Sequence, residues 1–257
     1  MYDIDSWIIA TILFVSMTMA IELGYRIGLK ILNKVSEPSR THVNAIQGSL
    51  LGILALLLGF TFSLGLQRYD SRSSAVVDEA NAIGTAYLRA GLLDPSVRSD
   101  AQSLLRQYLQ FRTQAASVNL ALLEQRSALL QQSRDLQAVL WQLSEQAIAV
   151  DDRPVTTGLF IQSLNDMFDA LETRNAALNR HIPEVVLFLL YGTFLMAGCI
   201  VGFASGVSGH RVSISMYIMI ALIVLLVFII IDLDRPRRGF IEVNQSSLFE
   251  LNESINR

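Results

Sequence analysis

Residues 45–90 read AIQGSLLGILALLLGFTFSLGLQRYDSRSSAVVDEANAIGTAYLRA, and the rest of the chain is organised around this stretch. Its first half, residues 45–66, carries no charged side chain and as a helix reaches roughly 33 Å, enough to cross the hydrocarbon core of a bilayer. From Gln67 the sequence becomes polar, yet neither Gly nor Pro interrupts it before Gly84. We therefore expect a spanning helix that continues as a stalk into an extramembrane domain.

The composition is that of a membrane protein, because 52% of the 257 residues are hydrophobic and only 17% are charged. The formal net charge is −3, and no basic run with interleaved aromatic residues is present, which argues against nucleic acid as a partner. The single cysteine, Cys199, excludes an intrachain disulfide and a thiolate cluster. The three histidines stand far apart in the sequence, so it predicts no metal site and no cofactor: His42, His181 and His210.

Four apolar stretches have the length of membrane spans: 7–29, 45–66, 185–207 and 213–231. Between the second and third, residues 67–182 show the apolar periodicity of helices, with a kink or break expected at 117–119, and no alternation typical of strands. This pattern predicts an all-α integral membrane protein with four transmembrane helices and a long-helix bundle inserted between the second and third. Residues 232–257 are expected to form a polar tail. All five prolines fall at the predicted boundaries: Pro38, Pro95, Pro154, Pro183 and Pro236.

Small residues line one face of the second span. They fall at i, i+4, i+7, i+11 and i+15 of a helix: Gly48, Gly52, Ala55, Gly59 and Ser63. Two interpretations stay open, close packing against another helix or the wall of a pore built by several copies of this span. In the third span, Gly198, Gly202 and Gly206 form a double GxxxG, which predicts close packing in a hairpin with the fourth span.

Charged residues gather where the spans end. After the second span stand four that either pair inside the bundle or ring a vestibule that selects ions: Arg68, Arg72, Asp78 and Glu79. After the fourth span stand five that crowd at the membrane interface: Asp232, Asp234, Arg235, Arg237 and Arg238. Within the first span, Glu22 either pairs with Arg26 at i+4 or carries protons.

The distribution of positive charge predicts the orientation in the membrane. No Lys or Arg precedes the first span, whereas Arg26, Lys30 and Lys34 follow it, which places the N-terminus outside the cytoplasm. The arginines of the tail and of the bundle's base favour the opposite orientation. Because the first helix usually dominates and long loops count less, we expect the bundle and both termini on the outside.

No enzyme motif is present: the chain has no GxSxG, HExxH or phosphate-binding loop, and its cysteine has no base near it in the sequence. Instead, LLGFTFSLGLQRYDSR (57–72), VVDEANAIGTAYLRAGLL (76–93) and DLDRPRRGFI (232–241) resemble the bestrophin-like family of mostly bacterial membrane proteins. That family is distantly similar to bestrophins, which are pentameric anion channels with four spans and a pore lined by the second.

The resemblance implies a homo-oligomer in a bacterial inner membrane that conducts a small anion along the second span. It also implies that Phe60 or Phe62 joins the small residues at a hydrophobic neck. Other functions fit the layout as well. The protein would be a membrane sensor or partner-binding module if the bundle binds a ligand or another protein. A proton-driven stator-like channel would use Glu22 or Asp232 as its essential acid. A structural scaffold is a further alternative, for which the sequence contains no specific motif.

Overall fold

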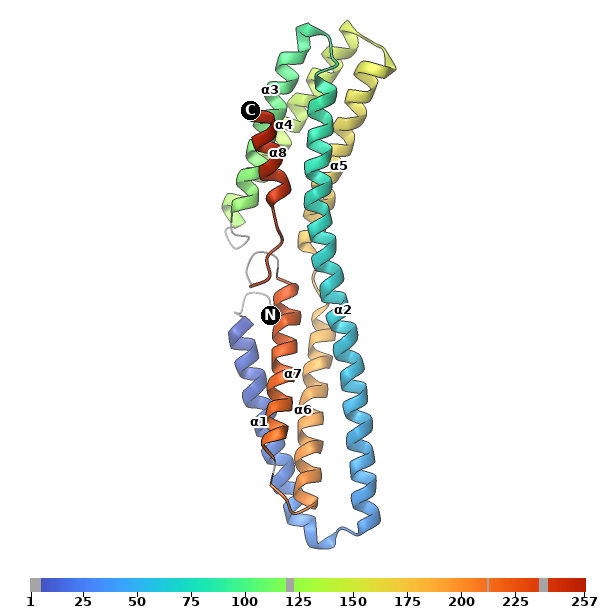
Figure 1. Cartoon of the computed structure of the whole chain (residues 1–257), viewed down its shortest axis with the longest axis vertical. Helices are drawn as coiled ribbons and strands as arrows, with labels where there is room; N and C mark the ends of the chain where they lie inside the picture. The colour runs from blue at the N-terminus through green and yellow to red at the C-terminus, as the bar shows by residue number, and fades with distance from the viewer. Residues whose placement is uncertain (1–5, 119–122, 212, 236–239) are drawn as a thin grey trace. The chain divides into compact units, whose positions relative to one another are not determined.

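The computed structural model describes residues 6–118, 123–211, 213–235 and 240–257, and within them every regular element is a helix (Figure 1). Four helical stretches are long and apolar enough to cross a membrane, and they contain α1, the first half of α2, α6 and α7. The protein is therefore an all-α integral membrane protein. Its contacts divide it into two compact units, one of residues 1–67 and 181–235 and the other of residues 68–180 and 236–257.

The first unit contains the four apolar helices. They are α1 (Ser6–Ile31), the first part of α2 (Glu37–Ala90), α6 (Glu184–Val207) and α7 (Ile214–Leu233). Large apolar side chains from all four pack in one core, among them Met17, Leu54, Phe194 and Ile230. Many other apolar side chains of these helices point outward, as expected of surfaces that contact lipid.

Glycines bring α1 and α6 into close contact. A Cβ atom on Gly202 would overlap the backbone carbonyl of Ile21, and one on Gly206 would overlap that of Tyr25. At Gly198 the nearest atoms also belong to α1. These glycines were predicted to pack the third span against the fourth, but they pack it against the first span, α1. Gly24 and Gly28 of α1 face α6 in the same way, so small residues on both helices allow the close approach.

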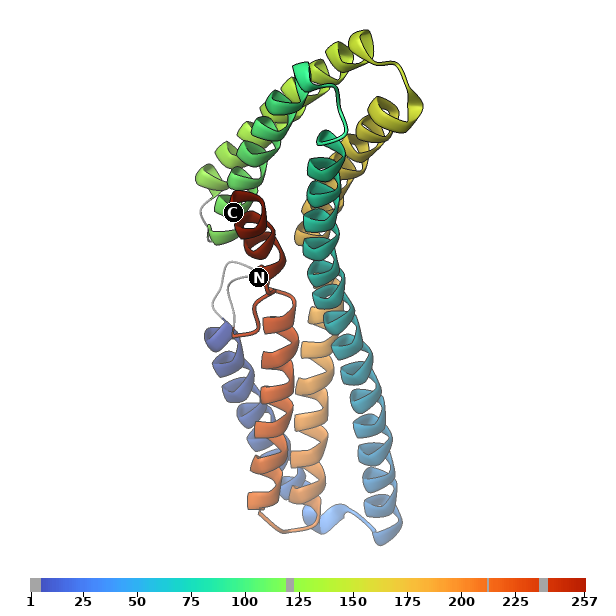
Figure 2. The ribbon, with the colours of Figure 1, turned by 45° about the horizontal axis from the view of Figure 1, so that its top comes forward.

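The second unit is a helical bundle. It contains the second half of α2, α3 (Pro95–Ser117), α4 (Leu123–Val150), the single π-helical turn η2 (Pro154–Gly158), α5 (Leu159–Asn179) and α8 (Ser246–Asn256). Asp94 caps α3 by accepting a hydrogen bond from the backbone N–H of Ser96 at 3.0 Å. α3 ends at Ser117, within the predicted break, and packs along α4, as Figure 2 shows. Asn119, the far end of that predicted break, lies outside the described residues.

The C-terminal segment belongs to the bundle. Within residues 232–257, which were expected to form a polar tail, Ser246–Asn256 form α8, which packs against α3 (Figure 1). Leu248 is fully buried, and Leu251 and Ile255 pack against the same core. These three residues follow one another at i, i+3 and i+7, so the apolar stripe of a docked helix is present in a segment that is polar on average.

Candidate functional site

The small-residue face of α2 is open. This face consists of Gly48, Gly52, Ala55, Gly59 and Ser63, and all five residues are exposed. Cβ atoms added to the three glycines would meet nothing within 4 Å, whereas those added at the contact of α1 and α6 would overlap the backbone of the other helix, at Gly24, Gly28, Gly202 and Gly206. The intrachain contacts of α2 are made instead by bulky side chains such as Leu54 and Leu58. Packing within one chain therefore does not account for the small-residue face.

The same helix presents a second exposed face, which is bulky. Ile53, Leu56 and Phe60 are exposed there, and at about 100° per residue they lie roughly a sixth to a third of a turn from the centre of the small-residue face. Phe60, 61% exposed, points in that direction, and Phe62 is half-buried against the core of the apolar helices. Phe60 thus points away from the small-residue face, and Phe62, seven residues after Ala55, lies at the edge of that face and packs against the core, so the proposal below does not include them in a neck.

Charged side chains at the end of α7 hold the first unit together. Oδ2 of Asp234 accepts a hydrogen bond from the backbone N–H of Ile182 at 3.0 Å, just before α6 begins. Arg235 donates from Nη1 to Oγ of Ser6 at 3.1 Å, at the start of α1. Asp232, Asp234 and Arg235 are all buried. The other two members of the predicted interface motif, Arg237 and Arg238, lie outside the described residues.

Within the first span, Glu22 pairs with Arg26 as the i, i+4 spacing indicates. Its Oε1 lies 2.6 Å from Nε of Arg26, and both side chains are more than half exposed. An exposed pair of this kind adds little stability.

In the bundle, three charged side chains form a buried cluster, which we call the Glu79 cluster: Glu79 of α2, Arg112 of α3 and Arg174 of α5. Nε of Arg112 lies 2.5 Å from Oε1 of Glu79, and Nη1 of Arg174 donates to the other carboxylate oxygen. The Glu79 side chain is 0% exposed and the two arginine side chains are 3% exposed. Arg174 also donates from Nη2 to Oε1 of Gln245, on the segment that precedes α8, at 2.6 Å. The cluster thus joins α2, α3, α5 and the C-terminal segment.

Charge interactions decide the protonation of this cluster. Burial raises the pKa of Glu79, but the attraction and hydrogen bonds of Arg112 and Arg174 outweigh it, so that the net pKa lies below the ordinary value. Burial likewise raises the pKa of the neighbouring Tyr108 phenol. Glu79 is therefore ionised at neutral pH and Tyr108 is not.

Arg72 is not part of the Glu79 cluster and instead binds the C-terminal end of α5. It is buried and donates from Nε to the backbone carbonyl of Ala177 at 3.1 Å and from Nη2 to that of Arg180 at 2.6 Å. These carbonyls stand at the C-terminus of α5, where a helix has unsatisfied acceptors and a partial negative charge. Arg72 thus stabilises the end of α5.

The burial of Arg72 and Glu79 does not fit the predicted vestibule of charges, since neither side chain faces solvent. Of the four residues, Asp78 is exposed and Arg68 is half-buried, so only these two side chains reach solvent. The sequence interpretation also missed Arg112, Arg174 and Gln245. A signal existed for the arginines, because Arg112 follows Tyr108 and Leu105 on the buried stripe of α3, and Arg174 follows Leu171 and Met167 on that of α5.

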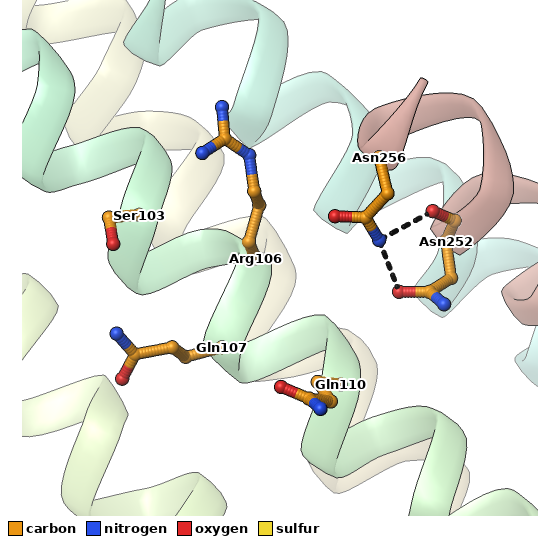
Figure 3. A pocket seen from close by; sticks show the side chains of 6 residues that line it. All are labelled: Ser103, Arg106, Gln107, Gln110, Asn252 and Asn256. Atoms are coloured by element: carbon orange, nitrogen blue, oxygen red, sulfur yellow. Dashed lines mark hydrogen bonds between the residues drawn. The ribbon is translucent and has the colours of Figure 1, made fainter.

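A polar surface cleft of about 240 Å³ lies between α3 and α8 (Figure 3). It is lined by Ser103, Arg106, Gln107, Gln110, Asn252 and Asn256. Asn256 donates to Oδ1 of Asn252 at 3.1 Å, and Arg106 donates to the hydroxyl of Tyr87 at 2.9 Å. The cleft therefore has amide groups and one cation, and no carboxylate among the described residues that line it.

The comparison with protein families decides what kind of protein this is. A family model, the Bestrophin-like domain, matches residues 25–248, which include most of the chain. The chain belongs to the Bestrophin-like family. The match begins in the second half of α1 and ends at Leu248, so the Bestrophin-like region takes in the Glu79 cluster and the start of α8. No curated protein and no solved structure matches the chain significantly.

Proposed function

We propose that this Bestrophin-like protein is a homo-oligomeric ion channel in which several copies of α2 surround a pore and turn their small-residue faces toward it. The observation that carries the proposal is the open face itself: Gly48, Gly52 and Gly59 all have free space on one exposed face of α2, whereas the glycines at the contact of α1 and α6 are packed tightly. One copy of four helices cannot enclose a wide pore, so a conducting assembly needs several copies around an axis.

The family supports an anion as the conducted ion, since bestrophins conduct anions, and a ring of about five copies follows from the same likeness. We place the protein in a bacterial inner membrane, with the bundle and both termini outside the cytoplasm, on the charge distribution around the first span. No catalytic step is part of this proposal.

Two measurements test the proposal. The mass of the protein in lipid nanodiscs reports the number of copies, and a monomer or dimer contradicts the pore. Single cysteines then report what the small-residue face contacts, in a Cys199→Ala background that removes the natural thiol. We expect Gly52→Cys to react with a charged, water-soluble thiol reagent and to lose chloride flux in vesicles as it does so.

Ile53→Cys is the matched control, because Ile53 is the next residue and lies on the bulky face. It should react slowly and keep its flux. If Gly52→Cys forms disulfides between copies but does not react with the charged reagent, the small-residue face is a dry packing surface between copies, and the pore lies elsewhere.

A second candidate function rests on the cleft between α3 and α8, which suits a binding module for a polar ligand or partner. Its amide side chains and Arg106 offer both donors and acceptors in about 240 Å³. This function would be favoured if the protein is a monomer in nanodiscs and if Arg106→Ala abolishes a response to a ligand of the bundle.

A further inference from the structure

The charges of the Glu79 cluster do not balance. Two guanidinium groups share one carboxylate, and all three side chains are removed from water. Burying ions in this way is costly unless each charge is compensated and each donor is used. A further carboxylate that attracts Arg112 is that of Glu172, but its side chain is 59% exposed and pairs with Arg134 at 3.2 Å. The cluster therefore has a surplus positive charge.

Buried donors in the cluster are also unused. Among the described residues, Nη1 of Arg112 and Nε of Arg174 have no hydrogen-bond partner. Both guanidiniums contact the same carboxylate, and each of them keeps one buried nitrogen donor without an acceptor. Arg174 directs its remaining hydrogen bond to Oε1 of Gln245, a neutral acceptor in a place that favours a negative one.

The electrostatics of Arg174 support the same reading. Burial lowers the pKa of Arg174, and the attraction of Glu79 does not offset that effect because Arg112 adds repulsion. The one carboxylate of Glu79 therefore does not fully compensate the positive charge of Arg174.

We propose that the Glu79 cluster is a binding site for a small inorganic anion of the halide type, with chloride the probe to use. The anion accepts hydrogen bonds from the unused guanidinium donors and supplies the second negative charge beside Gln245. Bound there, it stabilises the contact of α2, α3, α5 and the C-terminal segment. This site belongs to the extramembrane bundle and does not depend on conduction, so it goes beyond the proposed channel.

Thermal unfolding of the full-length protein in nanodiscs tests the site. Sodium chloride is compared with sodium gluconate at equal ionic strength, because gluconate is a much larger, organic anion that does not mimic a halide. A ligand that binds only the folded state raises the unfolding temperature by about 3–6 °C for each tenfold rise in its concentration above the dissociation constant. We expect such a rise with chloride, and its absence overturns the proposal.

The variant Gln245→Glu locates the effect. It adds a carboxylate of nearly the same shape beside Arg174, so it should unfold in gluconate at or above the temperature of the wild type in chloride, and it should no longer respond to chloride. The matched control is Gln114→Glu, an exposed position on α3 that should respond as the wild type does.

Each other result contradicts the anion site. If Gln245→Glu still responds to chloride, the anion binds elsewhere. If it fails to fold, the cluster does not tolerate the negative charge that the proposal says it lacks. Failure of the channel proposal would look different, because a monomeric or non-conducting protein would keep the chloride-dependent unfolding temperature and its loss in Gln245→Glu.

Discussion

Oε1 of Gln245 accepts a hydrogen bond from Nη2 of Arg174 at 2.6 Å, although the two residues are 71 positions apart in the sequence. Arg174 at the same time donates to Glu79, so the C-terminal segment is attached to the charged centre of the bundle. Leu248, three residues after Gln245, is fully buried in the apolar core of the same unit. The hydrogen bond of Gln245 and the buried side chain of Leu248 thus both attach the C-terminal segment to the bundle.

Replacing Glu79 with Gln should destabilise the bundle strongly. The change leaves two buried guanidiniums without a counter-charge, and breaking a buried ion pair from one side costs about 3–5 kcal/mol. Chemical denaturation followed by the resistance of the bundle to protease measures the loss. The neighbouring exposed variant Asp78→Asn is the control and should change stability by less than about 0.5 kcal/mol. Equal effects of the two variants would show that the Glu79 cluster adds no stability.

Acid should weaken the bundle through the same carboxylate. Because the pKa of Glu79 is lower in the folded protein than its ordinary value of 4.5, its contribution to stability is complete above that value and is lost as the pH falls through the folded pKa. The stability difference between the wild type and Glu79→Gln should therefore stay constant from pH 7 to about pH 5 and shrink below about pH 4. A difference that grows on acidification would mean that burial, not the arginines, decides the pKa of Glu79.

Replacing Gly202 with Ala should separate α1 from α6. The added methyl group overlaps the backbone of Ile21, which cannot move aside as a side chain can, and overpacking of this kind costs about 1–3 kcal/mol. Thermal stability in detergent measures the effect. Gly192→Ala, in the same helix but with nothing within 4 Å of the added atom, should be neutral or slightly stabilising. If both variants behave alike, the close contact of α1 and α6 is absent in the membrane.

Truncating Leu248 to Ala should release α8 from the bundle. Leu248 is 0% exposed, and truncating a buried leucine costs about 2–5 kcal/mol. We expect this cost to exceed the free energy that holds a short terminal helix on the bundle. Limited proteolysis should then cleave the C-terminal segment faster while the rest of the bundle stays intact. The adjacent Phe249, 42% exposed on the same helix, supplies the control Phe249→Ala, which should leave the cleavage rate unchanged.

The candidate sites were predictable only in part, and particular residues show why. The stripe of small residues from Gly48 to Ser63 was readable because helical spacing alone places them on one face. Whether that face was covered by another part of the chain depended on contacts between distant segments, and the structure leaves it open. Gly202 was readable as a residue of close packing, but its partner, α1 and not α7, is a long-range contact that a local pattern does not contain.

By itself the sequence determined the all-α membrane fold, because four long apolar stretches must form their backbone hydrogen bonds within helices when they enter lipid. Its motifs also indicated the Bestrophin-like family, which the family model confirms. Only the tertiary structure decided the pairing of Glu79 with Arg112 and Arg174 and the docking of α8, since these depend on which of several buried faces meet. Local periodicity predicts which face of a helix is buried, whereas the packing of the whole bundle determines which charged side chains meet.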